Sequence, residues 1–253
     1  MSAGAANGQH DRLRRIEQRI YDDGTVRIPE LARDLQVSEM TIRRDLDELE
    51  TLGIARRIRG GAVAVGPEPF DSRHRHHAKA KAVIADKLLA LVPDHGTVAF
   101  DASTTVYRLA SSMEVARDLV VVTNGMDTFE VLSATPGVTA TLTGGSREPR
   151  TGSLVGPVAN RCAEQFIFDV FVCSAAALDP VVGSTEASLA EAETKRVLAR
   201  TSSRVVLAAD RSKLDGRAQA RLFRPQEVDV LVTDLPPEDP RLDPYRDVIP
   251  ELR

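Results

Sequence analysis

Apolar residues recur at helical spacing in three segments near the start of the chain. The first segment covers residues 11–22, and the second begins near Pro29, a residue that suits the first turn of a helix. The third follows Ser38, whose hydroxyl can accept a hydrogen bond from a backbone N–H at a helix start. The predicted buried positions of the three helices are Leu13, Ile16 and Ile20; Leu31, Ala32 and Leu35; and Ile42, Leu46, Leu49 and Leu52.

After Gly53 the apolar pattern no longer has a helical period. Residues 54–59 alternate loosely, Gly60-Gly61 predicts a turn, and residues 62–65 resume as a strand. Two helices joined by a tight turn and followed by a hairpin are typical of a winged helix-turn-helix. The sequence therefore predicts an α+β winged helix-turn-helix domain over residues 1–65, with the third helix entering the major groove of DNA.

The third helix and the hairpin carry the predicted contacts to DNA. Because Ile42 and Leu46 face inward, Thr41, Arg43 and Arg44 are expected to face outward, where arginine can read guanine or hold a phosphate. The alternative is a solvated helix face in which the arginines pair with Asp45, Asp47 and Glu48. The predicted DNA-contacting residues are Ser38, Thr41, Arg43, Arg44, Arg57 and Arg59.

The stretch Gly66-Pro67-Glu68-Pro69 favours extended backbone and separates two regions of different pattern. We expect a linker over residues 66–77, a second domain over 78–235 and a surface tail over 236–253. In the second domain, a helix is predicted at 78–92. Apolar runs then alternate with helical segments, which predicts an α/β domain with a mainly parallel sheet covered on both faces. The predicted strands are 97–100, 119–123, 138–142, 170–173, 205–208 and 228–233, and the predicted helices are 105–116, 126–134, 157–166 and 188–201.

Polar clusters follow four of these predicted strands, at residues 101–105, 124–125, 143–147 and 210–213. Ligands of open parallel sheets bind beyond the carboxyl ends of the strands. Hydroxyl groups and free N–H groups at a helix start suit a phosphate, and Gly144-Gly145 allows the close backbone approach that an anion needs. Each cluster by itself is also explained by ordinary helix capping.

Composition narrows the function classes. The formal net charge is −4, but residues 1–66 hold 11 basic and 11 acidic residues, so the N-terminal part is neutral with a local basic face. The absence of Trp argues against single-stranded nucleic-acid binding by stacking. No signal peptide or apolar run of about 20 residues occurs, so a cytoplasmic protein without membrane contact is expected. Cys162 and Cys173 are expected to be reduced, and His74, His76 and His77 to form a solvated basic helix leader rather than a metal site.

The sequence resembles the DeoR family of bacterial transcriptional regulators. In the first domain the resemblance rests on "VSEMTIRRDLDELE" and "RIRGGA", with Arg59 where the family usually has His. In the second it rests on "DASTT", "VVTNG", "LTGGSREPRTGSLVGP", "EAETKR" and "AADRSK" in the same order, with Gly125 where the family has Ser. An Asp common in the family near 183–195 is missing, and Glu186 or Glu191 could replace it.

This resemblance implies a DNA-binding repressor of sugar or polyol genes, controlled by a phosphorylated metabolite. The second domain is then similar to the sugar-phosphate isomerase and CoA-transferase fold, with no cofactor, and a homodimer or homotetramer is expected to bind double-stranded operator DNA. The implied effector residues are Asp101, Ser103, Thr104, Thr105, Asn124, Gly144, Gly145, Arg147, Lys195 and Lys213.

Two other functions remain open. A sugar-phosphate isomerase needs a carboxylate base, and the related isomerases place aspartates just after the fourth strand, where this chain has Ser174-Ala175-Ala176-Ala177. Catalysis is therefore not expected. The other alternative is a DNA-binding regulator whose second domain only forms oligomers.

Overall fold

The computed structural model describes residues 3–65, 70–149 and 151–253. The chain forms two compact units, Met1–Glu68 and Pro69–Arg253. Within the described residues, no helix is long and apolar enough to cross a membrane.

The first unit is a winged helix-turn-helix. It contains α1 (Ala3–Asp23), β1 (Thr25–Arg27), α2 (Ile28–Asp34), α3 (Glu39–Thr51), β2 (Ala55–Ile58) and β3 (Gly61–Ala64). The strands form an antiparallel sheet in the order β1-β3-β2, and β1 is a short strand that the sequence pattern did not predict. Gly61 is required there, because a Cβ would lie 1.9 Å from the carbonyl oxygen of Val26 on β1. The apolar faces of the helices meet in one core that includes Ile16, Ile42 and Leu46, each fully buried.

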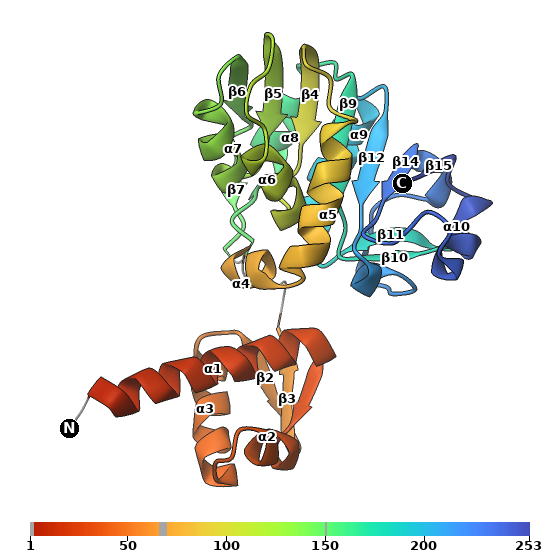
Figure 1. Ribbon diagram of the computed structural model, residues 1–253. Helices are drawn as coiled ribbons and strands as arrows, with labels where there is room; N and C mark the ends of the chain where they lie inside the picture. Colours follow the sequence, from red (N-terminus) through yellow and green to blue (C-terminus); the bar gives the residue numbers. More distant parts are fainter. Residues whose placement is uncertain (1–2, 66–69, 150) are drawn as a thin grey trace. The chain divides into compact units, whose positions relative to one another are not determined.

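A seven-stranded parallel sheet forms the centre of the second unit (Figure 1). The strand order is β15-β14-β12-β9-β4-β5-β6, and every neighbouring pair is parallel. The strands are β4 (Gly96–Phe100), β5 (Leu119–Thr123), β6 (Val138–Leu142), β9 (Val170–Ser174), β12 (Val205–Ala208), β14 (Val230–Val232) and β15 (Glu251–Leu252). From β4 the chain adds strands first on one side and then on the other, so the order reverses between β4 and β9, the point at which open sheets bind ligands.

Helices cover both faces of this sheet. Figure 1 shows α5 (Ala78–Leu89), α6 (Thr104–Ser111) and α7 (Met126–Ser133) in front of it, and α8 (Pro157–Ala163) and α9 (Leu189–Arg200) behind it. Ile84 and Val106 belong to the core on one face, and Ala163 and Ala192 to the core on the other. Burial on both faces explains why the strands are continuous apolar runs rather than alternating ones.

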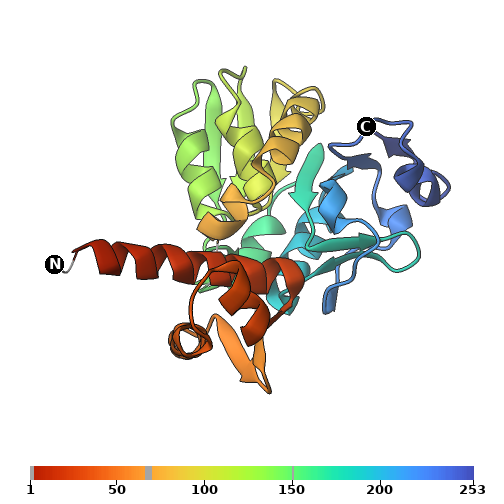
Figure 2. The same cartoon turned by 60° about the horizontal axis from the view of Figure 1, so that its bottom comes forward.

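Short elements surround the C-terminal ends of the strands. They are β7 (Ser146–Arg147) paired with β8 (Leu154–Val155), and a small antiparallel sheet of β10 (Ala177–Asp179), β11 (Gly183–Glu186) and β13 (Ala220–Arg221). Two 3-10 turns, η1 (Arg211–Lys213) and η2 (Pro225–Glu227), lie in the connections. Figure 2, turned so that this end comes forward, shows β10 and β11 beside the main sheet.

Part of the expected linker belongs to the second unit. Residues 70–75 form the helix α4 (Phe70–Arg75), which packs on α6. Phe70 and His74 both contact the ring of Tyr107 edge to face, at centroid distances of 5.5 and 5.2 Å. His74 is therefore not part of a solvated leader, because its ring is used in packing. Residues 66–69 lie outside the described residues.

The expected C-terminal tail is also part of the fold. Residues 236–253 contain η3 (Pro240–Leu242), α10 (Asp243–Arg246) and β15, which adds a parallel strand to β14. Tyr245 is fully buried, and its hydroxyl donates to the carbonyl of Leu178 at 3.0 Å. The prolines and acids suggested a tail, but two apolar side chains, Tyr245 and Ile249, complete the core.

Candidate functional site

The third helix of the first unit presents two arginines to solvent. Ile42 and Leu46 are fully buried, whereas Arg43 and Arg44 are exposed. Ser38 caps the helix by accepting from the N–H of Thr41 at 3.1 Å, and the two hydroxyl oxygens lie 2.9 Å apart. The outward face predicted from helical spacing is therefore the exposed face.

The neighbouring acids of this helix have partners other than Arg43 and Arg44. Asp45 is paired with Arg12 of α1 at 2.6 Å, and Glu48 accepts from the side-chain amide of Gln9 at 2.9 Å. Asp47 is paired with Arg57. Arg43 and Arg44 are therefore not paired with these three acids. Arg43 does pair with Glu39 of its own helix, at 3.7 Å.

Arg57 and Arg59 lie differently, although both belong to the wing. The guanidinium of Arg57 folds back onto α3, where it pairs with Asp47 and donates to the carbonyl of Arg43 at 3.3 Å. The backbone N–H of Arg57 also donates to the carboxylate of Glu50, at 2.7 Å. Arg57 therefore joins the wing to the third helix, while Arg59 is exposed beside the turn.

In the second unit, a buried ion-pair network lies where the strand order reverses. Asp101 follows β4 and is fully buried. One of its oxygens accepts from the N–H of Ser103 at 2.9 Å, and the other accepts from the N–H of Ser174, at the end of β9, also at 2.9 Å. This second oxygen lies 2.8 Å from Nζ of Lys195. The network ties β4 to β9 at this end of the sheet.

All three N–H groups of Lys195 are used within the protein. It donates to the carbonyl of Ser174 at 2.8 Å and pairs with both Asp101 and Glu186. Burial works to lower the pKa of Lys195, but the two carboxylates outweigh burial and raise it above its ordinary value. Burial likewise works to raise the pKa of Asp101, and the charge of Lys195 holds it below the ordinary value. Both side chains are thus buried and paired within the protein, at the carboxyl ends of β4 and β9.

Lys213 lies at the same strand ends and keeps a free donor. Its ammonium donates to the hydroxyl of Ser174 at 2.8 Å and to the carbonyl of Ala175 at 2.6 Å. A lysine carries three N–H groups, so one remains without a partner among the described residues. Burial lowers the pKa of Lys213. Of the predicted cations of this unit, Lys213 is thus the one placed at the switch point with a donor to spare.

The predicted hydroxyl groups of α6 have mixed roles. Ser103 caps the helix by accepting from the N–H of Val106 at 3.2 Å, as the capping alternative required. The hydroxyl of Thr104 donates to the carbonyl of Arg73 on α4 at 3.5 Å. Thr105 is buried in the same turn. The cluster therefore joins α4 to the end of β4.

The predicted glycines and Arg147 lie in the segment that follows β6. Gly144 and Gly145 have φ angles of +67° and +113°, and a Cβ on Gly145 would lie 2.7 Å from the carbonyl oxygen of Val155. Arg147 is exposed on β7, and its Nη2 would lie 3.7 Å from a Cβ on Gly152. Backbone geometry requires both glycines, whether or not a ligand binds there.

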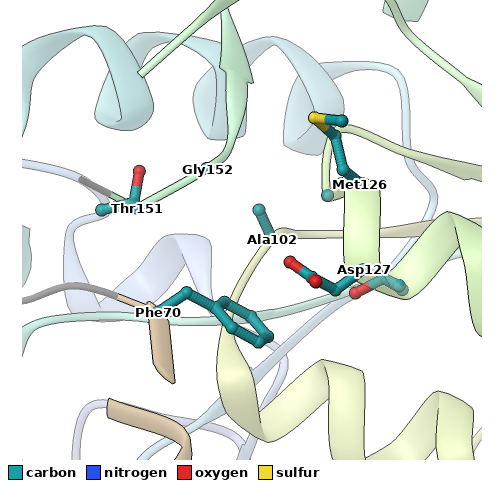
Figure 3. A pocket seen from close by; sticks show the side chains of 8 residues that line it. Phe70, Ala102, Met126, Asp127, Thr151 and Gly152 are labelled. Carbon is teal, nitrogen blue, oxygen red and sulfur yellow. The ribbon is translucent and has the colours of Figure 1, made fainter. Parts of the chain in front are cut away.

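A shallow pocket lies beside the ends of β4 and β5 (Figure 3). Its walls are Phe70, Ala102, residues 125–128 and the pair Thr151-Gly152. None of the ten predicted effector residues lines it, although Ala102 and Gly125 are sequence neighbours of Asp101, Ser103 and Asn124. Sequence reasoning missed Phe70 because it was assigned to the linker, and missed Thr151-Gly152 because only the fold brings that loop to β5. An isolated antiparallel β-bridge between Gly125 and Ser153 holds that loop beside the end of β5.

The described residues contain no group of three or more His, Cys, Asp or Glu that could hold a metal ion. Cys162 and Cys173 are both free. Cys173 is fully buried in β9, and burial raises the pKa of its thiol well above the ordinary value.

Comparisons with known proteins match both units. Residues 12–68 match the DeoR-like helix-turn-helix domain, and residues 76–235 match the DeoR C terminal sensor domain. The chain is 32% identical over 233 residues to the transcriptional repressor AccR of Agrobacterium fabrum, covering 90% of each protein. It is 28% identical over 232 residues to the glycerol-3-phosphate regulon repressor of Escherichia coli, covering 90% of this chain and 92% of that protein.

Among solved structures, ribose 5 phosphate isomerase A from Neisseria gonorrhoeae matches with 17% identity and a TM-score of 0.36, over 53% of this chain and 52% of that one. A likeness of this size carries no argument about activity.

Proposed function

The chain belongs to the DeoR family of transcriptional regulators, and from this premise we propose that it represses genes of sugar or polyol metabolism. The first unit binds double-stranded operator DNA. A phosphorylated sugar or polyol binds the second unit and weakens that binding. One relative is the glycerol-3-phosphate regulon repressor of Escherichia coli, which supports this class of effector.

The observation that carries the DNA-binding proposal is the exposed pair Arg43-Arg44. Asp45, Asp47 and Glu48 are held by other partners. Among the described residues, Arg43 pairs with Glu39 at 3.7 Å and Arg44 pairs with no acid, so most of the positive charge of this face is left exposed. Positive charge on an exposed recognition helix attracts the phosphate backbone and allows bidentate contact with guanine. Thr41 and Arg59 flank this face, while Ser38 and Arg57 support it through the helix cap and the contact of the wing with α3.

For the effector, we assign the phosphate to the switch point at Lys213. Its spare N–H lies at the carboxyl end of β9, where ligands of open parallel sheets bind. We also assign Arg147, an exposed cation on β7, to the anion. Thr105, Asn124 and the backbone of Gly144-Gly145 complete the polar surround. Asp101 and Lys195 act as positioning residues, because their buried pair fixes Ser174, which Lys213 contacts.

The helix α4 is the element through which binding would reach the DNA-binding unit. It is the first helix after the boundary at residues 68–69, and its carbonyl at Arg73 accepts from Thr104, beside the switch point. A ligand that prefers one placement of α4 shifts the population toward that placement. A coupling of about 1–3 kcal/mol would change operator affinity by roughly 5–150-fold.

The proposed function also bears on the oligomeric state and on catalysis. Repeated half-sites about 34 Å apart are read by paired helix-turn-helix units, so we propose a homodimer or homotetramer. We propose no enzymatic activity, because β9 ends at Ser174 and the residues that follow it, Ala175-Ala176-Ala177, supply no carboxylate base.

The DNA-binding part is tested with an operator duplex selected from random sequence. Arg43→Ala and Arg44→Ala should each weaken operator binding by roughly 5–150-fold, measured by fluorescence anisotropy at fixed salt. Arg14→Ala, which removes an exposed arginine of α1, is the matched control and should bind as the wild type does. Wild-type affinity in both recognition-helix variants would show that this face does not read DNA.

The effector part is tested by thermal shift against phosphorylated sugars and polyols, with the free sugars alongside. A ligand of the native state raises the melting temperature by mass action. The expected result is a shift with one phosphate, no shift with its free sugar, and loss of the shift in Lys213→Ala. If a ligand binds and operator affinity does not change, the second unit is not the control element.

A further inference from the structure

The pocket beside Phe70 differs in chemistry from the cationic switch point at Lys213. Its only charged side chain is the carboxylate of Asp127. Its other walls are an aromatic ring, a methionine, two threonines, an alanine and two glycines. We propose that this pocket holds the hydroxyl-bearing carbon chain of the effector and that Asp127 selects for hydroxyl groups. This inference rests on the proposed function, since it assigns the second half of the same ligand.

Asp127 is a hydrogen-bond acceptor without a partner in the fold. It lies in the first turn of α7, is exposed, and makes no hydrogen bond or ion pair within residues 70–149 and 151–253. Figure 3 shows its carboxylate and the ring of Phe70 turned toward the same space beside Ala102. A carboxylate accepts from neighbouring hydroxyl groups and repels a phosphate. The end of the ligand in this pocket is therefore neutral and carries donors.

Thr128 supplies a second, independent indication. Its side-chain oxygen is buried and has no hydrogen-bond partner in the described part of the chain, and the residue lines the pocket. A buried hydroxyl without a partner is unfavourable by about 1–3 kcal/mol. A ligand hydroxyl both donates and accepts, so it can satisfy Thr128 and Asp127 together.

Gly125 lies beside this buried oxygen. Its φ is −99°, a value that any residue adopts, so the backbone does not require glycine. Space does: a Cβ would lie 2.9 Å from Cα of Ala102 and 3.1 Å from the hydroxyl oxygen of Thr128. A side chain here would press on Thr128 and narrow the space beside Ala102.

Phe70 forms the apolar wall. Its ring packs on Tyr107 at one edge and lines the pocket, where it can cover the C–H face of a sugar or polyol chain. Because Phe70 begins α4, the carbon chain of the effector would touch the first helix after the unit boundary. The pocket thus separates recognition of the carbon chain from recognition of the phosphate.

The experiment compares two probes on the full chain by isothermal titration calorimetry. One is the tightest binder among glycerol 3-phosphate, ribose 5-phosphate and glucose 6-phosphate, and the other is inorganic phosphate. Asp127→Asn should weaken the hydroxyl-bearing probe by roughly tenfold or more, the loss expected for a hydrogen bond to a charged group. Inorganic phosphate should bind unchanged or more tightly, because a repelling charge has gone.

Three controls separate the pocket from the rest of the site. Asp86→Asn, an exposed Asp of α5, should leave both probes unchanged. Thr128→Val should lower the affinity for the hydroxyl-bearing probe only, and Lys213→Ala should lower the affinity for both probes. Melting temperatures of the unliganded variants check that each is folded.

Each remaining outcome overturns a defined claim. If Asp127→Asn changes both probes equally, or neither, the pocket does not hold the carbon chain, while the proposed function stands. If none of the three hydroxyl-bearing phosphates binds the wild type, the proposed effector class and the pocket assignment both fail.

Discussion

The two units place their charged residues in opposite ways. In the first unit, Arg43, Arg44 and Arg59 are exposed, and the charges that are buried there only support them. In the second unit, Asp101, Glu186 and Lys195 are buried and paired with one another. A DNA backbone is a large external partner that exposed arginines can reach, whereas a small anion needs a preorganised site whose shape is fixed from inside. We therefore interpret the exposed arginines of the first unit as groups for contact with DNA, and the buried ion pairs of the second unit as groups that hold the sheet in shape.

Replacing the central cation of the buried network tests this contrast most strongly. Lys195→Met leaves Asp101 and Glu186 buried without their cation, so the free energy of unfolding should fall by about 3–5 kcal/mol. Urea unfolding at pH 7 measures it. Lys79→Met, at an exposed position of α5, is the matched control and should cost less than about 0.5 kcal/mol. Equal effects of the two substitutions would mean that the network does not hold the strand ends.

In the first unit, a buried ion pair and an exposed one can be compared in the same way, with a smaller expected loss of stability. Arg12 holds the carboxylate of Asp45 with two hydrogen bonds of 2.6 and 2.9 Å, and Asp45 is only 2% exposed. Arg12→Ala should cost about 1.5–3 kcal/mol, because a buried charge loses its donors. Arg19→Ala removes only exposed pairs with Asp23 and Asp34, which are screened by solvent, and should therefore lower stability much less than Arg12→Ala does.

Hydrogen exchange locates the effect of Arg12→Ala. Amide protection should fall in α3, the helix that carries Asp45, and operator affinity should fall with it. Unchanged protection of α3 together with weaker DNA binding would instead make Arg12 a direct DNA contact.

The smallest effect expected is a pH dependence at α4. Burial, together with the nearby charges of Arg108 and Lys81, lowers the pKa of His74 below its ordinary value of 6.5. The folded protein thus favours neutral His74, and the unfolded chain binds the proton more readily. Stability from this group is present above pH 6.5 and is lost as the pH falls below 6.5 through the folded pKa.

The variant His74→Phe keeps a ring against Tyr107 and removes the titration. Its unfolding free energy should decline less than that of the wild type between pH 7 and pH 5.5, as measured by urea unfolding at each pH. Parallel curves would show that His74 titrates alike in the folded and unfolded chain.

Local pattern was enough to predict most elements. The predicted strands 119–123, 138–142 and 205–208 have the bounds of β5, β6 and β12. In β5 and β12 the pattern was clear because a strand buried on both faces is a continuous apolar run, whereas the edge strand β6 is only partly buried. The position of α3 follows from Ser38 and the spacing of its apolar residues. The predictions of a surface tail over 236–253 and of a linker that extends to residue 77 were wrong. A few apolar residues, among them Phe70 and Tyr245, decide whether a polar segment packs against the fold.

In the candidate sites, too, some features were determined by the sequence and others only by the tertiary structure. The outward face of a helix depends only on residues three and four positions apart, so the sequence by itself determined that Arg43 and Arg44 face solvent. It also determined which polar groups follow the strands. Only the tertiary structure decided that Lys195 closes on Asp101 and Glu186, that Lys213 keeps a donor, and that Phe70 meets Asp127 across a pocket. Apart from the pair Lys195–Glu186, which are 9 positions apart, those contacts join residues tens of positions apart. Their partners are chosen by the order of the strands in the sheet, which local pattern does not encode.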